Sequence, residues 1–519
     1  MAARRLDERR AVPPGGPEPA LAWRERPWAR ALTERPRLVV AAVLAAFVAI
    51  HLVRLGVVLV NGDGDNYLRQ AVDLSRGGLP RARYSPGWGA LLAPVAWLAG
   101  GRYSPMFLAG SVVNLAVSVL ALALVHRFLE RHLPAPAAAV LTAILALGQT
   151  ATLVLVGVEV EPLSLLSVAA TLYFLEGGRP ALAALSTGLG AASRIALSPF
   201  FAVLWVLQLG RHRRSALLAL ALLAAGVGAY LLTQPASGGY AGIASEAYDL
   251  DGGPGSVLRR AASVASSHAL RYARLGIPAL VWPGAVLGSV PGAVLGLATT
   301  AVLGLGGWTL ARRWRRGRPL ELVTAATVAA GAYLVALCFW PANDGALLRL
   351  VVPLSPVLLL ALAEGLGAVR ARLSVLARAW LVPGLAVLAT ALALGSGAAL
   401  AVTHSRSPGP VRDFIAVGDE ARGRLPAGPV LSHLPMLAGL VTDHEVVGFD
   451  PGADPGDVLD AARESGACSV LLDAIAQRGS RDRDLRSWAS DGRAGPVLAR
   501  RGATTVVALE VPWCPPAPR

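Results

Sequence analysis

The stretch GDGDNYLRQAVDLSRGGLPRARYSPGWG, residues 62–89, follows directly on the first long apolar run of the chain. It places Asp63 and Asp65 where the chain should just have left a membrane. Carboxylates at a membrane surface are costly to desolvate, so a pair followed by Tyr67 indicates a site rather than an ordinary connecting loop. The alternative is that both aspartates cap a helix that we expect to begin near Asn66.

The rest of this segment supports an arrangement at the membrane surface. Gly62 and Gly64 would let the backbone turn tightly around Asp63. The run from Leu68 to Leu79 is mainly apolar on one face, as expected for a helix in the membrane interface. Residues 84–88 then place aromatic rings at the depth of the lipid headgroups, where aromatic belts also occur for purely structural reasons.

Composition sets the class of protein. Apolar residues make up 54% of the chain and charged residues only 16%, with a mean hydropathy of +0.54, well beyond a soluble globular average. We predict an α-helical polytopic membrane protein with about eleven transmembrane helices, each about 20 residues long. The predicted spans lie near residues 37–60, 106–127, 136–153, 162–176, 181–194, 196–210, 215–233, 279–309, 320–340, 349–368 and 379–402.

The charge distribution predicts the orientation. The formal charge of +15 would suggest nucleic acid in a soluble protein, but here the arginines gather in short loops between apolar runs, so we expect no nucleic-acid partner. Arginines crowd the first 36 residues, which we interpret as a disordered cytoplasmic tail. The transmembrane domain then covers residues 37–402, with the larger loops at 61–105 and 234–278 on the outer face.

The segment 403–519 has a different pattern. Short β-rich runs at 429–434, 445–449, 468–473 and 503–511 alternate with helical stretches such as 455–464, which predicts a small extracytoplasmic α/β domain. Cys468 and Cys514 both fall in this domain, and a single bridge between them is one possibility. Cys338 lies in an apolar run and is expected to pack there.

The ordered set of motifs resembles the GT-C integral-membrane glycosyltransferases, which use polyprenyl-phosphate sugars, in the manner of mannosyl- and aminoarabinose-transferases. Their first outer loop carries an acidic motif, a tyrosine, a helix with spaced small and apolar residues, and a Tyr-Pro-Gly segment. The matching residues here are Asp63, Tyr67, Ala71, Leu74, Gly77 and residues 84–87, followed by residues 161–163, residues 188–194, and Arg349 with Pro353 and Pro356.

The resemblance implies roles for individual residues. Transfer from a lipid phosphate needs a base near the acceptor hydroxyl and positive charge near the departing oxygen. The family's base corresponds to Asp63, with Asp65 as runner-up, and its second acidic position to Glu159 or Glu161. The alternative for the two glutamates is that they are ordinary loop carboxylates at the interface.

Arginines are the candidates for the phosphate, since a guanidinium presents a fork of donors to phosphate oxygens. Arg194 and Arg349 sit at outer span ends, and Arg54 is a third candidate that needs a partner such as Asp63 or Asp65. Arginines that reach to lipid headgroups are the competing explanation. Two tyrosines complete the predicted substrate-binding set: Tyr67 and Tyr84.

No cofactor is predicted. A divalent metal is compatible with the chemistry, but His433, Asp443 and His444 lack the fixed spacing of a metal site. The expected function is an inverting glycosyltransferase on the outer face of a bacterial cytoplasmic membrane. Its partners would be a polyprenyl-phosphate-linked sugar, membrane lipids, and a glycan, glycolipid or protein acceptor. The alternatives are a transporter or flippase of envelope lipids, for which we see no duplicated halves, and a structural subunit.

Overall fold

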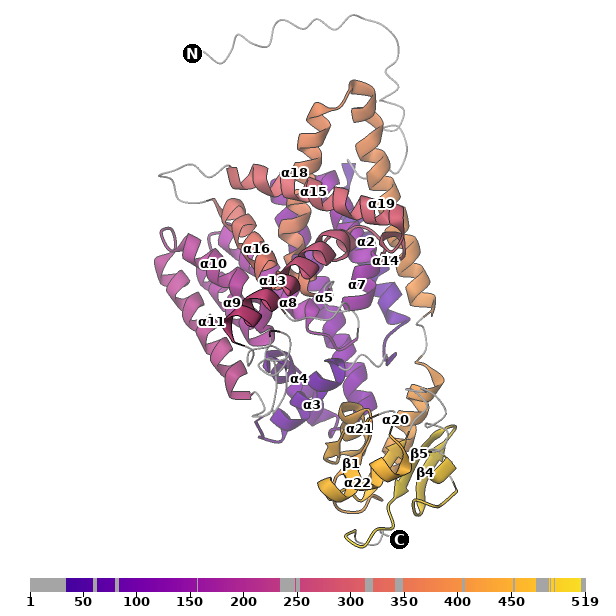
Figure 1. Cartoon of the computed structure of the whole chain (residues 1–519). Helices are drawn as coiled ribbons and strands as arrows, with labels where there is room; N and C mark the ends of the chain where they lie inside the picture. The colour runs from indigo at the N-terminus through magenta and orange to yellow at the C-terminus, as the bar shows by residue number, and fades with distance from the viewer. Residues whose placement is uncertain are drawn as a thin grey trace, which may run out of the picture.

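The computed structural model describes residues 34–58, 63–79, 84–155, 157–233, 248, 253–312, 321–340, 349–403, 407–450, 453–472, 485, 487–489 and 491–514. Most of them belong to a bundle of helices, and a small α/β unit lies at one end of it (Figure 1). The predicted fold class, a mainly helical protein with a small C-terminal sheet, is confirmed at this level.

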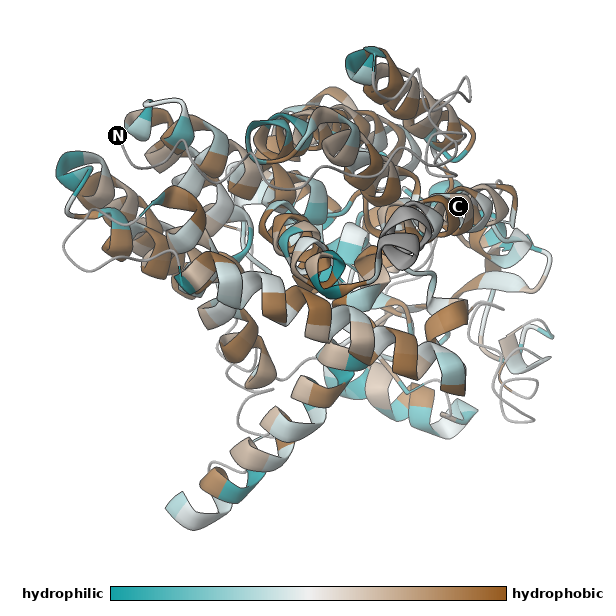
Figure 2. Ribbon diagram, turned by 90° about the horizontal axis from the view of Figure 1, so that it is seen from above, coloured by the Kyte–Doolittle hydropathy of each residue, from teal (hydrophilic) through white to brown (hydrophobic). Residues whose placement is uncertain are grey.

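The bundle is built from the apolar runs of the sequence. Its main helices are α2 (Pro36–Leu52), α5 (Tyr103–His132), α6 (Ala135–Leu147), α7 (Gln149–Val154), α8 (Glu161–Glu176), α9 (Pro180–Ser193), α10 (Ser198–Gln208), α11 (Arg213–Thr233), α15 (Val290–Arg312), α16 (Leu322–Cys338), α18 (Ser355–Arg372) and α19 (Val375–Thr403). Large apolar side chains stay exposed on outer faces, among them Leu232 at 85% and Val290 at 82%, which suits contact with lipid rather than water (Figure 2).

Among the described residues, four helical segments are long and apolar enough to cross a membrane: 103–132, 213–233, 290–312 and 349–372. Several apolar helices are shorter, so the chain is a multi-pass membrane protein, while the number eleven stays a prediction. The prediction of one uninterrupted span over residues 279–309 is wrong. The chain there forms η4 (Pro278–Leu280), α14 (Gly284–Leu287) and α15, because its prolines and glycines interrupt the helix.

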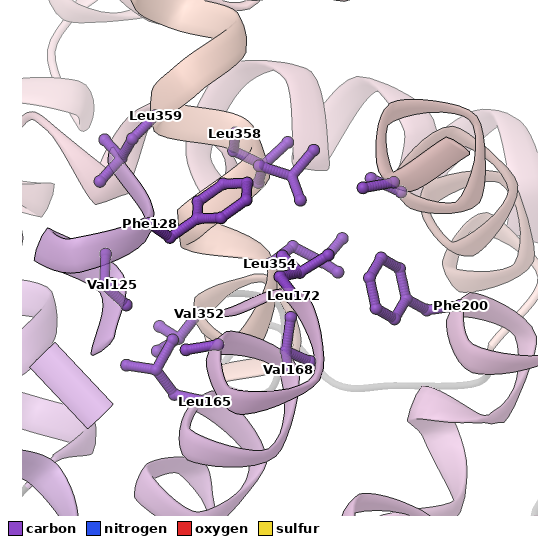
Figure 3. Packing of buried hydrophobic residues seen from close by; sticks show 14 of the residues in the cluster. Val125, Phe128, Leu165, Val168, Leu172, Phe200, Val352, Leu354, Leu358 and Leu359 are labelled. Carbon is purple, nitrogen blue, oxygen red and sulfur yellow. The ribbon is translucent and has the colours of Figure 1, made fainter. Parts of the chain in front are cut away.

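The centre of the bundle is packed by aliphatic and aromatic side chains from distant segments (Figure 3). Phe128 of α5, Val168 of α8 and Phe200 of α10 meet Leu358 of α18 there, and all four are buried. The 349–372 segment is the most enclosed of the four long segments: 78% of its most apolar stretch is buried, against 17% for 290–312. The segment that begins at Arg349 is therefore central to the bundle.

Close helix approach depends on glycine where α15 crosses α18. A Cβ at Gly306 would overlap the carbonyl oxygen of Ala361, and one at Gly365 would overlap that of Val302. Small residues of this kind let helix backbones approach in membranes, where packing rather than water exclusion drives association.

We predict that Gly306→Ala destabilises the protein by about 1–3 kcal/mol, because the added methyl forces the two helices apart. Gly304→Ala is the matched control, since Gly304 lies on the same helix with open space around its Cβ position. Thermal unfolding of the two variants in detergent is the measurement. Equal midpoints for both variants would show that the crossing does not depend on this contact.

Two helices between α2 and α5 cover one end of the bundle (Figure 1). α3 (Asp63–Ser75) begins at Asp63 and not near Asn66, so Gly64 is helical and makes no tight turn. α4 (Gly87–Leu98), an apolar helix that we did not predict, follows it. A Cβ at Gly87 would lie 2.6 Å from the backbone of Ala192, so α4 begins in contact with the end of α9.

The C-terminal α/β unit contains α20 (Gly409–Ala421), β1 (Val430–Leu431), α21 (Pro435–Thr442), β2 (Val446–Val447), α22 (Pro455–Ser465), β3 (Ser469–Leu472), β4 (Val497–Arg501) and β5 (Thr504–Ala508). Its sheet has the order β2-β1-β3-β5-β4, parallel from β2 to β3 and antiparallel beyond. The four predicted β-rich runs contain β1, β2, β3 and β5, and the predicted helix is α22. The sequence interpretation missed β4, α20 and α21.

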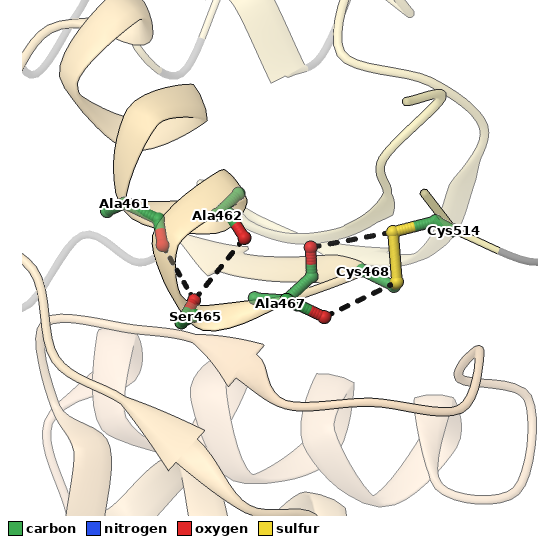
Figure 4. Close-up of a disulfide and its surroundings, with 7 residues drawn as sticks. Ala461, Ala462, Ser465, Ala467, Cys468 and Cys514 are labelled. Atoms are coloured by element: carbon green, nitrogen blue, oxygen red, sulfur yellow. Dashed lines mark hydrogen bonds between the residues drawn. A yellow bond between two sulfur atoms is a disulfide. The ribbon is translucent and has the colours of Figure 1, made fainter. Parts of the chain in front are cut away.

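A disulfide joins Cys468 to Cys514 (Figure 4). It ties the segment after β5 to the start of β3, next to the end of α22, where the Ser465 hydroxyl donates to the carbonyl of Ala461 at 2.6 Å. The bridge that the sequence left open is therefore present. Cys338 is a free, half-buried thiol in α16, as expected.

Candidate active site

Five charged side chains from distant parts of the chain meet where helices of the bundle end. Asp63 and Glu161 each occupy the first residue of a helix, α3 and α8, where the helix dipole favours a negative charge. Glu159 lies just before α8, and Arg194 follows the end of α9. Arg349 opens the enclosed segment 349–372.

Arg349 is the centre of this cluster. Its Nη2 donates to Glu159 at 2.6 Å and to Glu161 Oε2 at 3.2 Å, and its Nε donates to Glu161 Oε1 at 2.8 Å. Its Nη1 donates to Asp63 Oδ2. One guanidinium therefore binds three carboxylates that lie far apart in the sequence, which matches the fixed fork of donors that an arginine presents.

Arg194 adds a second cation, and its Nη1 lies 2.7 Å from Glu161 Oε1. The side chain of Glu161 is fully buried, so these two guanidiniums are what keeps a charged carboxylate tolerable there. With all five groups ionised, the three carboxylates exceed the two guanidiniums by one negative charge. An added proton or cation is therefore favoured electrostatically at the cluster.

Asp63 is held on both of its oxygens. The Tyr84 hydroxyl donates to Oδ1 at 2.6 Å, while Arg349 occupies Oδ2. Tyr84 is itself positioned by Gln70, whose side-chain amide donates to its backbone carbonyl at 2.8 Å, and by Tyr67, whose ring centroid lies 5.5 Å from its own. The Asp63 side chain keeps 20% exposure, so a reactant can reach a carboxylate whose orientation is already fixed.

The segment after Tyr84 fastens this loop to the bundle. The Ser85 hydroxyl accepts the backbone N–H of Ile195 at 3.1 Å, directly beside Arg194. Sequence interpretation gave the loop its aromatic motif but no role for Ser85. A short hydroxyl residue before proline was the available signal, and it did not indicate the distant partner.

Two candidates lie outside the cluster. Asp65 points toward Tyr103, whose hydroxyl donates to it at 2.9 Å, and burial raises the pKa of Asp65 to about 6 despite that hydrogen bond. Arg54 donates to the backbone carbonyl of Thr152 at 2.5 Å. Within the described ranges it forms no ion pair, so the expected pairing of Arg54 with Asp63 or Asp65 is not what the structure contains.

Two of the three C-terminal residues that were weighed as metal ligands, Asp443 and His444, have other partners. Asp443 forms ion pairs with Arg76 and Arg422, and His444 hydrogen-bonds through Nδ1 to the backbone carbonyl of Thr442 at 2.9 Å. No group of three metal-ligating side chains occurs among the residues that the structure describes.

The buried carboxyl of Asp65 leads to a prediction of how the stability of the folded protein depends on pH. Its pKa is about 6 in the folded protein against an ordinary 3.8, so the folded state binds the proton more tightly, and stability falls as pH rises from about 4 to about 6. Asp65→Asn removes this loss and still accepts the Tyr103 hydrogen bond. We expect it to be more stable than wild type at pH 7.5, by roughly 2–3 kcal/mol, with little difference near pH 4.

Thermal unfolding across that pH range measures the effect. A wild-type protein whose midpoint does not fall relative to Asp65→Asn between pH 4 and pH 6 would contradict the assignment of a buried, ionising carboxyl at this position.

Comparison with known proteins identifies structures that share this fold. No family model matches the sequence, and no curated protein matches it either. Solved structures do match, and they show that the chain has the fold of the GT-C membrane glycosyltransferases, as the sequence resemblance implied.

The matching structures include ArnT from Cupriavidus metallidurans. Its apo form has a TM-score of 0.52 and 14% identity, over 94% of this chain and 100% of that one. The oligosaccharyltransferase of Archaeoglobus fulgidus has a TM-score of 0.50 and 12% identity, over 83% of this chain and 67% of that one. Mycobacterial arabinofuranosyltransferase AftD has a TM-score of 0.50 and 14% identity over 92% of this chain, which spans 40% of AftD.

Proposed function

We propose that this protein is a glycosyltransferase that transfers a sugar from a polyprenyl-phosphate donor to an envelope acceptor on the outer face of a bacterial cytoplasmic membrane. The observation that carries the proposal is the meeting of Asp63 with Arg349 and Arg194 at one end of a membrane bundle. A base and two cations are what the reaction needs. The likeness in fold to ArnT, one structure of which holds undecaprenyl phosphate, supports a lipid-linked donor.

The chemistry assigns each group a step. A hydroxyl oxygen of the acceptor attacks the anomeric carbon of the donor sugar, and its proton passes to Asp63. The bond between the anomeric carbon and the phosphate oxygen breaks, and its electron pair leaves with the polyprenyl phosphate. A single displacement of this kind inverts the configuration. Arg349 and Arg194 stabilise the negative charge that develops on the departing phosphate.

In this scheme Arg349 binds the donor phosphate and also controls whether Asp63 is free to act as the base. Without donor it is bound by Asp63, Glu159 and Glu161. A donor phosphate competes for the same guanidinium, and when Nη1 turns to the phosphate, Oδ2 of Asp63 is released to accept the proton. Glu159 and Glu161 keep the rest of the guanidinium in place, since their side chains are buried and each binds it separately.

The orientation is part of the proposal, and two observations support it. Arg131 lies in the last turn of α5 and forms an ion pair with Glu176 at the end of α8, the helix that begins at Glu161. Arg372 ends α18, in the segment that begins at Arg349. Both arginines therefore lie at helix ends opposite the site, as the bias of arginine toward the cytoplasm predicts for an outer site. The disulfide between Cys468 and Cys514 is typical of an oxidising compartment outside the cytoplasm. Both observations support an outer location for the α/β unit and the charged cluster.

We predict that Asp63→Asn lowers the rate of sugar transfer by about 10²–10⁴-fold, the usual contribution of a general base. Asp65→Asn is the matched control two residues along α3, since its carboxyl is turned to Tyr103, and we expect it to stay within a few-fold of wild type. The measurement is transfer from radiolabelled polyprenyl-phosphate sugars in proteoliposomes with equal protein levels.

Undiminished turnover by Asp63→Asn would remove that residue from the mechanism. Movement of the lipid across the bilayer with no covalent transfer would identify a flippase and end the proposal of a transferase.

Arg349→Lys tests the second half of the mechanism. Lysine keeps a positive charge near the buried carboxylates but cannot bind two of them and a phosphate with a planar fork. We expect kcat/KM for the donor to fall by about 10²-fold with the protein still folded. Arg370→Lys, in the last turn of the same enclosed segment, is the control. Unchanged donor kinetics in Arg349→Lys would exclude a phosphate role.

A further inference from the structure

The C-terminal α/β unit is packed onto the helix that carries Asp63. One continuous apolar cluster contains Leu68 and Val72 of α3 together with Phe414 of α20 and Leu440 of α21, all of them buried. α21 packs directly against α3. The unit is therefore joined to the outer loop through a shared core, and is more than a tail connected by the chain after α19.

An ion-pair clamp closes this contact at the far end of α3. Nη2 of Arg76, the residue after α3 ends, lies 2.8 Å from Asp443 Oδ1 and 2.9 Å from Oδ2. Arg422, which follows α20, places its Nη2 2.9 Å from the same Oδ2. A further hydrogen bond runs from Arg69 Nη1 to the carbonyl of Gly439 at 3.4 Å. Asp443 thus joins α3, α20 and α21.

Asp443 is held in an unusual backbone conformation. It follows the end of α21 with φ of 61°, the one positive φ among the described residues that are not glycine. Aspartate and asparagine tolerate this left-handed region better than other side chains. Burial disfavours the charged form of Asp443, but hydrogen bonds from Arg76 and Arg422 outweigh it and hold the pKa of the carboxyl below its usual range. The clamp is therefore charged at neutral pH.

The two ends of α3 have different partners. Asp63 begins the helix inside the charged cluster, and Arg76, thirteen residues later, lies in the clamp. At 1.5 Å per residue the helix spans about 20 Å between them. A helix is stiff over this length, so a tilt at the clamp moves the carboxylate at the other end. Misplacement by about 1 Å is enough to cost 10²-fold in rate.

We propose that the C-terminal α/β unit positions the catalytic helix, and that Asp443 is a positioning residue which sets the place of Asp63 through α3. This inference rests on the proposed function. An exposed ion pair contributes little to stability, whereas Asp443 binds two arginines from different elements and its side chain is 28% exposed. Its effect is on geometry at the distant carboxylate more than on the stability of the fold.

The test is Asp443→Asn, which keeps the size and the tolerance for positive φ and removes the charge. We expect kcat to fall about tenfold, with the KM for the donor within twofold of wild type, because the arginines at the phosphate are untouched. Hydrogen–deuterium exchange should become faster in residues 63–75 and stay unchanged in α8 and α18. Arg76→Gln should have the same effect, and the double variant should be no worse than Asp443→Asn.

Glu420→Gln is the matched control, since it removes an ion pair with Arg424 within the same unit, and it should alter neither readout. Wild-type kinetics and exchange in Asp443→Asn would overturn the inference. Faster exchange throughout the bundle would also overturn it, because the role would then be structural. If the wild-type protein transfers no sugar, the proposed function fails, and faster exchange confined to α3 still decides whether the clamp positions that helix.

Discussion

The interaction on which the rest of the site depends is the binding of three carboxylates by one guanidinium. Arg349 joins α3, the start of α8 and the segment 349–372, and these elements carry most of the chemistry we assign. Buried carboxylates repel each other and are poorly solvated, so Glu159 and Glu161 could not remain charged at the end of a membrane bundle without it. The guanidinium of Arg349 therefore connects these elements and is also a candidate ligand for the donor phosphate.

The packing of the bundle supports the charged cluster around Arg349. α8 and α9, which position Glu161 and Arg194, approach closely at Gly190, where an added Cβ would lie 2.9 Å from the side chain of Ser167. The apolar core around Phe128 and Leu358 then fixes the direction of the segment that begins at Arg349. Close helix packing at small residues thus contributes to the positions of the charged side chains at the ends of these helices.

The sequence predicted much of this, for identifiable reasons. Apolar runs of membrane length and the ordered motifs indicated the fold, and the same motifs named Asp63, Glu161, Arg194 and Arg349. The motif match favoured Asp63 over Asp65, but no sequence pattern showed which of the two side chains faces the cluster. Residues two apart on a helix point to different sides, so the answer required the true start of α3.

Other features were beyond the reach of sequence patterns. α4 was missed because twelve residues are too few for a span and its apolar composition has no clear periodicity. β4 was missed because Arg500 and Arg501 break the apolar pattern of a strand. The partners of Asp443 are Arg76 and Arg422, and no local pattern links Asp443 to a residue as distant in the sequence as Arg76.

The order of the charged residues along the chain has a consequence for biogenesis. Asp63 is separated from Arg349 by 286 positions, and Glu159 by 190. A ribosome feeding this protein into the membrane therefore delivers the acidic members long before their principal counter-ion emerges. Until then Arg194 can only partly neutralise these carboxylates, so the complete cluster can form only after synthesis has reached the last third of the chain.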